Sequence, residues 1–274
     1  MAKPDIDFAD RYRVRPGAKV ELRDAAADDT GGVQDKPQTK KLLRRHAKRM
    51  ADLQYLLYAE NRRALLVILQ AMDAGGKDGT IRRVMGPLNP QSCRVTSFKA
   101  PTEEELAHDF LWRIHRAVPR RGEIGIFNRS HYEDVLIVRV RSLVPKSVWS
   151  RRYEQINAFE KILSANDVHI LKFFLHISKD EQLRRLKKRL SAPNKQWKAN
   201  QQDFEERKRW DDYITAYEEA IRRCSTEWAP WYVIPADQKW FRNLAVMQIV
   251  VEKLKGLRMK FPKPAFDVST VRPK

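Results

Sequence analysis

The sequence LLVILQAMDAGGKDGT, residues 65–80, has the form of a buried β-strand that runs into a phosphate-binding loop. A strand with both faces covered is a continuous apolar run, and small residues before a helix expose backbone N–H groups to an anion. Gly76 and Lys77 match the pattern G-x-x-x-x-G-K-[ST], but Ala71 and Asp78 replace its first and last residues. The stretch therefore predicts a phosphate site of unusual composition.

Two carboxylates, Asp73 and Asp78, lie inside this loop, where they would repel a phosphate. A Mg²⁺ ion removes the conflict because it binds carboxylate and phosphate oxygens together. We therefore expect Asp73 to hold a metal and Lys77 to supply positive charge. For Asp78 two interpretations remain, a role near the metal or a cap on the following helix. The other loop residues expected to contact phosphate are Ala74, Gly75, Gly76, Gly79 and Thr80. If the loop binds no phosphate, its glycines only make a tight turn.

Further apolar runs alternate with helical patterns along the chain, as in a doubly wound α/β protein. The predicted strands span residues 64–70, 93–98, 123–128, 170–177 and 231–235. This order predicts a three-layer α/β/α fold with a mostly parallel, five-stranded sheet. The connections are expected to be helices.

Three predicted helices begin with capping boxes, in which a side chain at the first position pairs with an acid three residues later. These pairs are Thr102 with Glu105, Ser178 with Glu181, and Asp203 with Glu206, and the first opens a helix predicted over 103–118.

The chain is predicted to contain an N-terminal arm, a core and a short tail. Residues 1–39 have no sustained hydrophobic period, so we expect an arm that packs over a neighbouring surface or is partly mobile. The core is expected over 40–262, with a helical lid at about 184–210, because a polar, proline-containing stretch interrupts the helical pattern there. Residues 263–274 are expected to form a C-terminal tail.

The composition points to a soluble protein with a polyanionic partner. The 274 residues include 54 Lys and Arg against 35 Asp and Glu, a formal charge of +19. Such a surplus attracts nucleic acid, anionic lipid or a phosphate-rich substrate, without choosing among them. No apolar run reaches the roughly 18–20 residues of a membrane span, and the first residues do not resemble a secretory signal. We therefore predict a cytoplasmic protein.

A second polar cluster, GIFNRSHYEDV at residues 125–135, follows the third predicted strand. Ligands of open α/β sheets bind beyond the carboxyl ends of the strands, so this cluster should lie beside the phosphate loop. Arg129 could pair with two phosphate oxygens through its planar fork, and Glu133 could join the metal. Glu133 could instead complete a capping box with Ser130, and His131 could be a structural, hydrogen-bonded histidine.

The predicted lid carries runs of basic residues that could close over phosphates. Solvated faces are the commoner explanation for such runs. A helix that leaves the fourth strand would, however, bring its arginines toward the transferring group and exclude water. The basic residues expected to contact substrate are Arg184, Arg185, Arg189 and Lys198.

Six ordered blocks together resemble the polyphosphate kinase 2 family. They are AMDAGGKDGTIRRVMGPLNPQ, SFKAPTEEELAHDFLWRIH, IFNRSHYEDVLIVRV, FFLHISKDEQ, KQWK and APWYVIPADQKWFRN, and the likeness spans about residues 10–262. The NRSHYED block resembles the subgroup that phosphorylates both nucleoside mono- and diphosphates. The resemblance implies a P-loop kinase core with a helical lid.

The resemblance also implies which residues act. The loop residues of the family match Asp73, Lys77 and Asp78, and those of its second motif match Asn128, Arg129, His131 and Glu133, while the lid arginines fall near Arg184, Arg185 and Arg189. Many relatives outside the subgroup have Asn near the position of Glu133, which suggests that this acid helps to accept a monophosphate. Asp73, Lys77, Arg129 and Glu133 are the expected catalytic residues, with Asp73 and Glu133 on the metal.

The expected reaction is reversible transfer of the terminal phosphate of inorganic polyphosphate to AMP or ADP, in line and without a covalent enzyme intermediate. The implied cofactor is Mg²⁺, with Mn²⁺ as a substitute. The implied partners are polyphosphate and AMP, ADP or ATP, with guanine nucleotides as further candidates, but neither membrane nor nucleic acid. A homodimer or homotetramer is expected. The alternatives are an ATP-dependent P-loop nucleotide kinase and a basic RNA-binding protein with a vestigial phosphate loop.

Overall fold

Six strands form one sheet in the order β1-β6-β5-β2-β4-β3 in the computed structural model, which describes residues 7–22, 27–33 and 36–272. The strand bounds are β1 Arg13–Val14, β2 Ala64–Gln70, β3 Cys93–Ser97, β4 Ile124–Asn128, β5 Val168–His176 and β6 Trp231–Pro235. Neighbouring strands pair in parallel except β1, which runs antiparallel to β6. The central position of β2 brings the loop after it to the middle of the carboxyl edge.

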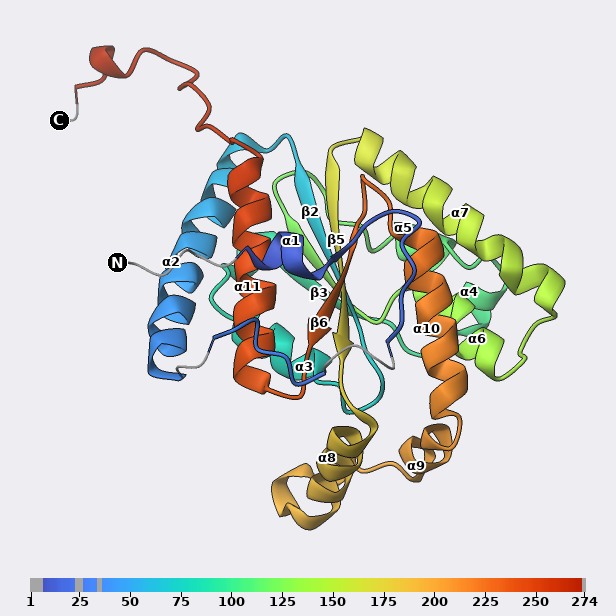
Figure 1. Cartoon of the computed structure of the whole chain (residues 1–274). Coiled ribbons are helices and arrows are strands. Elements are labelled where there is room, and N and C mark those ends of the chain that lie inside the picture. The colour runs from blue at the N-terminus through green and yellow to red at the C-terminus, as the bar shows by residue number, and fades with distance from the viewer. Residues whose placement is uncertain (1–6, 23–26, 34–35, 273–274) are drawn as a thin grey trace.

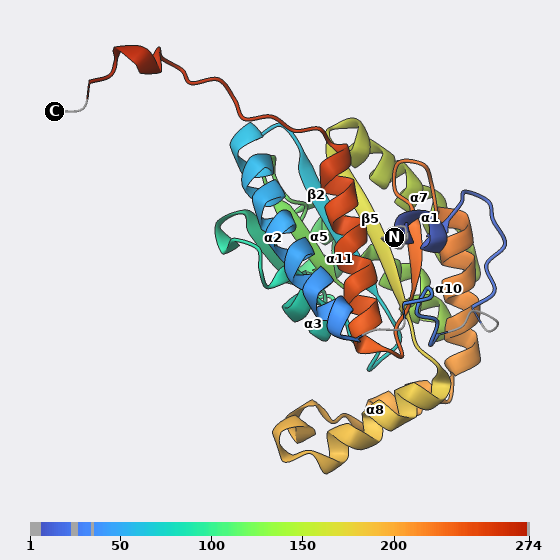
Figure 2. The same cartoon turned by 60° about the vertical axis from the view of Figure 1, so that its left-hand side comes forward.

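Helices cover both faces of the sheet (Figure 1). α2 and α11 lie side by side on one face, and α7 and α10 cover the other (Figures 1 and 2). The helix bounds are α1 Phe8–Tyr12, α2 Lys36–Glu60, α3 Lys77–Thr80, α4 Glu103–Leu106, α5 Trp112–His115, α6 Ile137–Val140, α7 Lys146–Ala165, α8 Lys179–Ser191, α9 Gln201–Arg207, α10 Trp210–Cys224 and α11 Lys239–Gly256. Alternate residues of β2 join two apolar clusters, with Leu65 in one and Leu66 in the other. The predicted three-layer α/β/α fold is confirmed.

The prediction of a five-stranded sheet was one strand short. The five predicted strands are present, and β1 is added at the edge beside β6. A strand of two residues is too short to produce a hydrophobic period, so the sequence pattern could not indicate it. β1 follows α1, where Phe8 and Tyr12 pack against Phe241 of α11 with ring centroids 5.4 and 5.9 Å apart. The described part of the arm thus contacts the core.

The single helix predicted over 103–118 was wrong, because the chain forms two short helices there, α4 and α5. Asp109 lies between them, and its Oδ1 accepts a hydrogen bond from the backbone N–H of Leu111 at 2.9 Å. A short Asp side chain that bonds the backbone two residues on mimics a turn and competes with helix. The carboxylate therefore ends the periodic pattern locally.

Only one of the three predicted capping boxes is complete. Thr102 and Glu105 make both reciprocal hydrogen bonds. Ser178 accepts from the backbone of Glu181, but the Glu181 side chain pairs with arginines of its own helix. The box predicted at Asp203 was wrong, because α9 begins earlier, with Asn200 as its cap.

α8, a 3-10 turn over Pro193–Lys198, and α9 form a lid that projects beyond the carboxyl edge of the sheet (Figures 1 and 2). The lid begins at Lys179, a few residues before the predicted boundary. After α11 the chain leaves the body as an extended tail that includes a 3-10 turn over Val268–Thr270 (Figure 2). No helix within the described residues is long and apolar enough to cross a membrane.

Candidate active site

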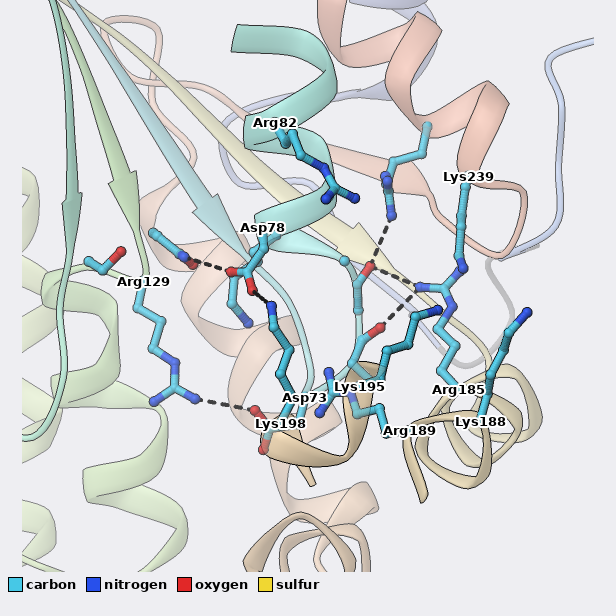
Figure 3. Close-up of a pocket in the computed structure, with 18 of the residues that line it drawn as sticks. Asp73, Asp78, Arg82, Arg129, Arg185, Lys188, Arg189, Lys195, Lys198 and Lys239 are labelled. Atoms are coloured by element: carbon cyan, nitrogen blue, oxygen red, sulfur yellow. Dashed lines mark hydrogen bonds and ion pairs between the residues drawn. The ribbon is translucent and has the colours of Figure 1, made fainter. Parts of the chain in front are cut away.

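A strongly basic pocket of about 560 Å³ opens where the loop after β2 meets the lid (Figure 3). Eleven of its lining residues are Lys or Arg, and two are Asp. The basic residues are Lys77, Arg82, Lys99, Arg129, Arg185, Lys188, Arg189, Lys195, Lys198, Lys239 and Arg242. Close positive charges repel one another, so this arrangement favours the binding of anions that neutralise them.

The loop between β2 and α3 has the backbone conformation of an anion cradle. Gly76 precedes α3 with φ of 106°, a region that favours glycine. A Cβ atom at this position would overlap the guanidinium of Arg242, which lies against the loop. Glycine is therefore required here both by the left-handed backbone and by the close approach of a buried arginine.

Lys77 and Asp73 both belong to the loop and line the basic pocket. Lys77 Nζ donates to the backbone oxygen of Ala71 at 2.8 Å, and burial, followed by the charge of Arg129, lowers the pKa of Lys77. Asp73 Oδ1 accepts from Arg129 Nη2 at 3.2 Å. Arg129 comes from the end of β4 and has φ of 64°, which turns its side chain toward the loop. The segments that follow β2 and β4, both predicted to carry catalytic residues, thus meet at an Asp–Arg pair.

Asp78 is held from two directions by side chains outside its own helix. Asn128 Nδ2 donates to one carboxylate oxygen at 3.0 Å, and Lys198 Nζ of the lid donates to the other at 2.9 Å. The hydrogen bond from Lys198 is the largest favourable influence that lowers the pKa of Asp78. The proposed capping role is not observed, because no side chain caps α3. Asp78 instead connects the loop to the lid.

Arg185 fastens the base of the lid to the loop. Its Nη1 donates to the backbone oxygens of Ala74 and Gly75, both at 3.1 Å, and its Nη2 donates to the oxygen of Ala236 at 2.6 Å. A guanidinium satisfied by backbone oxygens has few donors left for a ligand. Arg185 therefore shapes the phosphate loop from behind.

Glu133 lies on the far side of the Asp73–Arg129 pair, in a smaller cavity of about 50 Å³. Asp73 and Arg129 line both cavities, so this ion pair marks the boundary between them. Tyr213 and Tyr217 of α10 line the small cavity as well. The alternative of a capping box is not observed, because Ser130 caps the backbone of Tyr132 instead of that of Glu133.

Comparison with known proteins identifies the family. The model described as Polyphosphate kinase 2 (PPK2) matches residues 33–262 of the chain. The chain belongs to the polyphosphate kinase 2 family. It is 55% identical over 258 residues to the AMP/ADP-polyphosphate phosphotransferase of Meiothermus ruber, which covers 93% of this chain and 96% of the relative.

Two further relatives support the same family. The ADP-polyphosphate phosphotransferase of Rhodopseudomonas palustris is 48% identical over 265 residues, with 92% of each chain covered. The crystal structure of Polyphosphate Kinase 2 from Arthrobacter aurescens TC1 superposes with a TM-score of 0.92 at 45% identity, and covers 96% of this chain and 94% of that chain. The family and the fold expected from the six sequence blocks are therefore confirmed.

The structure brings most predicted site residues to one place, but Thr80, His131, Glu133 and Arg184 do not line the basic pocket. Asp73, the loop through Gly79, Asn128, Arg129, Arg185, Arg189 and Lys198 line the basic pocket. Thr80 is buried behind the loop, where its hydroxyl donates to the oxygen of Gly76 at 3.2 Å. His131 was matched to the second motif of the family as a phosphate or nucleotide contact, but its side chain is fully buried and points to Glu160, as the alternative of a structural, hydrogen-bonded histidine predicted. Arg184 projects outward and pairs with Glu181 instead of lining the pocket.

Six basic residues of the pocket were not among the predicted site residues: Arg82, Lys99, Lys188, Lys195, Lys239 and Arg242. The last two come from the first turn of α11. A signal existed. The amino end of a helix carries partial positive charge and favours acids, so two cations there are unfavourable unless an anion binds nearby. The block KWFR directly after the last parallel strand has this unfavourable pattern.

Proposed function

We propose that the protein transfers the terminal phosphate of inorganic polyphosphate to AMP and to ADP. The observation that carries the proposal is the pocket of eleven basic residues built around a phosphate loop that contains Asp73 and Asp78. An ordinary nucleotide offers too little negative charge to balance so many cations. A chain of phosphates offers enough. The names of the relatives from Meiothermus ruber and Rhodopseudomonas palustris support this substrate class.

In the proposed reaction an oxygen of the acceptor's terminal phosphate attacks the end phosphorus of the polymer in line. The bond to the next phosphate breaks, and a polyphosphate shorter by one unit leaves. The acceptor oxygen is already anionic, so no strong base is needed. The backbone N–H groups of the loop, Lys77 and Arg129 would stabilise the charge on the moving phosphoryl group, and the loop and both side chains line the basic pocket.

The residues present fit a magnesium ion. Within the described residues, no group of three or more His, Cys, Asp or Glu side chains is arranged to hold a metal. Mg²⁺ does not require one, because it commonly takes one or two carboxylates and completes its shell with water and substrate phosphates. Asp73 and Glu133 line the same small cavity and are the proposed ligands. When bound, the ion would screen the repulsion between the two anionic substrates, and Mn²⁺ has the same oxygen preference.

The decisive assay mixes the protein with polyphosphate, Mg²⁺ and AMP in the absence of ATP and follows ADP and ATP with time. Formation of ATP through ADP supports both steps, whereas ADP alone restricts the acceptor to monophosphates. Transfer from ATP but not from polyphosphate would favour an ordinary nucleotide kinase. Tight RNA binding without any transfer would favour the third alternative. GMP in place of AMP tests the base preference.

We also propose that the chain forms a homodimer or homotetramer. Phe266, Val268 and Val271 of the tail are more than half exposed, and a hollow of about 570 Å³ beside α2 is lined by the exposed side chains of Tyr55 and Tyr58. Exposed apolar groups of this kind mark association surfaces. Sedimentation equilibrium should therefore find an oligomer that Phe266→Asp weakens. The matched change Val148→Asp at another exposed apolar residue should leave the oligomer intact, and a monomeric wild type would refute the proposal.

A further inference from the structure

A lysine lies in the centre of the sheet, where a charge is costly. Lys172 is in the middle of β5 with no solvent exposure, and its Nζ is 2.5 Å from Oε2 of Glu160 on α7, which is equally buried. Replacing a buried ion pair with apolar side chains of similar volume is often neutral or stabilising, so such a pair contributes little to stability. Its presence calls for another explanation.

The ion pair belongs to a network of hydrogen bonds that uses every proton of the ammonium group and leaves His131 Nδ1 without a partner among the described residues. Lys172 also donates to the hydroxyl of Tyr132 at 2.8 Å and to the backbone oxygen of Cys224 at 2.6 Å, which uses all three ammonium protons. Glu160 Oε1 accepts from the Tyr132 hydroxyl at 2.9 Å and lies 3.3 Å from Nε2 of His131. We name these four side chains, His131, Tyr132, Glu160 and Lys172, the buried cluster.

The charge state of the buried cluster follows from its surroundings. Burial alone would raise the pKa of Glu160, but Lys172 and His131 outweigh it and the pKa lies below its usual value. Burial lowers the pKa of His131. Glu160 is thus the carboxylate that receives the hydrogen bonds, and a neutral His131 donates through Nε2. The buried cluster lines neither the basic pocket nor the small cavity, so it does not touch substrate.

Two members of the buried cluster come from the same segment as two expected catalytic residues. Arg129 and Glu133 flank the segment and line the cavities, whereas Ser130, His131 and Tyr132 between them are fully buried. The segment continues as a 3-10 turn of only five residues, His131–Val135, whose geometry is weak without outside support. The motif therefore has an outer set that faces the cavities and an inner set that is tied to α7, β5 and the end of α10.

We propose that the buried cluster is a positioning unit that fixes Arg129 and Glu133 at the boundary between the two cavities. The inference rests on the proposed phosphoryl transfer. Tyr132 is adjacent to Glu133 in the chain, so its anchored ring fixes the direction of the next side chain. A network in which every hydrogen bond of the ammonium and carboxylate is used holds one arrangement more narrowly than apolar packing does.

The central test is Tyr132→Phe, which removes one hydroxyl and keeps the ring. We expect kcat to fall about tenfold, because displacements well below 1 Å at reacting groups already cost large factors in rate. The matched control is Tyr12→Phe, which removes a part-buried hydroxyl outside the buried cluster, bonded to Asp29 at 2.8 Å. The control should change kcat less than about twofold while shifting Tm by a similar amount.

A double-mutant cycle with Glu133→Gln separates positioning from general weakening of the fold. If Tyr132 acts through Glu133, then Tyr132→Phe should lower kcat by less than about twofold once Glu133 is changed. Equal factors in both backgrounds, or no loss in the single variant, would overturn the inference. Wild-type activity in Glu133→Gln would instead refute the catalytic role of Glu133, and the cycle is then run with Arg129→Lys.

An apolar replacement tests the same point without an unpaired charge. The triple variant Tyr132→Phe, Glu160→Leu and Lys172→Met should unfold within about 3 °C of the wild type, whereas Lys172→Met alone should lower Tm by about 10 °C because it leaves a buried carboxylate. A triple variant that is stable yet slow supports positioning. Full activity in a stable triple variant would contradict it.

Discussion

Replacing Arg242 with methionine should make the protein more stable and less active. The side chain is 3% exposed, and among the described residues it donates to Asn243 Oδ1 at 2.9 Å and to the oxygen of Gly75 at 3.5 Å. Burial, followed by the charge of Arg185, lowers its pKa from 12.5 to about 10. That shift corresponds to roughly 3 kcal/mol of penalty on the charged form. Methionine keeps the apolar stem without the charge.

The expected gain in the free energy of unfolding is about 2 kcal/mol, because losing the hydrogen bond to Asn243 offsets about 1 kcal/mol. In a chain of this size that raises Tm by about 4–8 °C. The folded-state pKa of Arg242 is depressed, so its penalty is fully present below pH 10. It fades between pH 10 and the unfolded value. Measurements at pH 7–8 should therefore record the whole gain.

The same change should lower kcat/KM for polyphosphate by about 10–100-fold, since a charged hydrogen bond to a phosphate contributes about 1.5–3 kcal/mol. Differential scanning fluorimetry and initial rates measure the two effects on one preparation. Arg121→Met, at an exposed residue of the loop before β4, serves as the control and should alter neither quantity. A variant that is destabilised, or that keeps full activity, would show that Arg242 is a structural arginine and not a substrate ligand.

Three other perturbations have defined outcomes. Lys188 is exposed and lines the pocket, whereas its exposed neighbour Lys187 does not line it. Lys188→Gln should reduce the slope of log KM for polyphosphate against log salt concentration by about 0.7, and the control Lys187→Gln should leave that slope unchanged. Asp73→Asn should lower kcat by about 100-fold or more and raise the Mg²⁺ concentration needed for half activity, with Tm nearly unchanged, and an unaltered Mg²⁺ titration would refute its role. Burial raises the pKa of Asp134 to about 6 despite the nearby Arg152, so between about pH 4 and 6 the folded state binds a proton that the unfolded state does not, and stability falls as pH rises through that range. Asp134→Asn should therefore raise Tm at pH 8 but not at pH 4. An equal change of Tm at both pH values would contradict this.

The centre of the fold was predictable because its signals are local. The continuous apolar run of β2 and the small residues after it require neighbours on both faces and a tight approach at Gly76, whatever the rest of the chain does. Edges were harder. β1 has two residues, and α4 and α5 are separated by one aspartate that prefers its own backbone, so neither feature leaves a sustained period.

The site was predictable where a motif carries it and unpredictable where distant segments complete it. Arg242 reaches the loop from a helix more than 160 positions away in the chain, so its place depends on the packing of α11. His131 was misplaced for a different reason. Arg129 has a left-handed backbone, and Ser130, His131 and Tyr132 after it are fully buried.

The hydrogen bonds from Arg185 to the phosphate loop limit how the lid can open. Arg185, halfway along α8, donates to backbone oxygens of the phosphate loop, and Arg207, at the end of α9, donates to the backbone oxygen of Lys179. Both ends of the lid are therefore held by hydrogen bonds. We therefore expect opening to move mainly the part of the lid around Lys198, whose contact with Asp78 would have to break. A long polymer would then pass beneath a small moving part of the lid while the phosphate loop that binds it stays rigid.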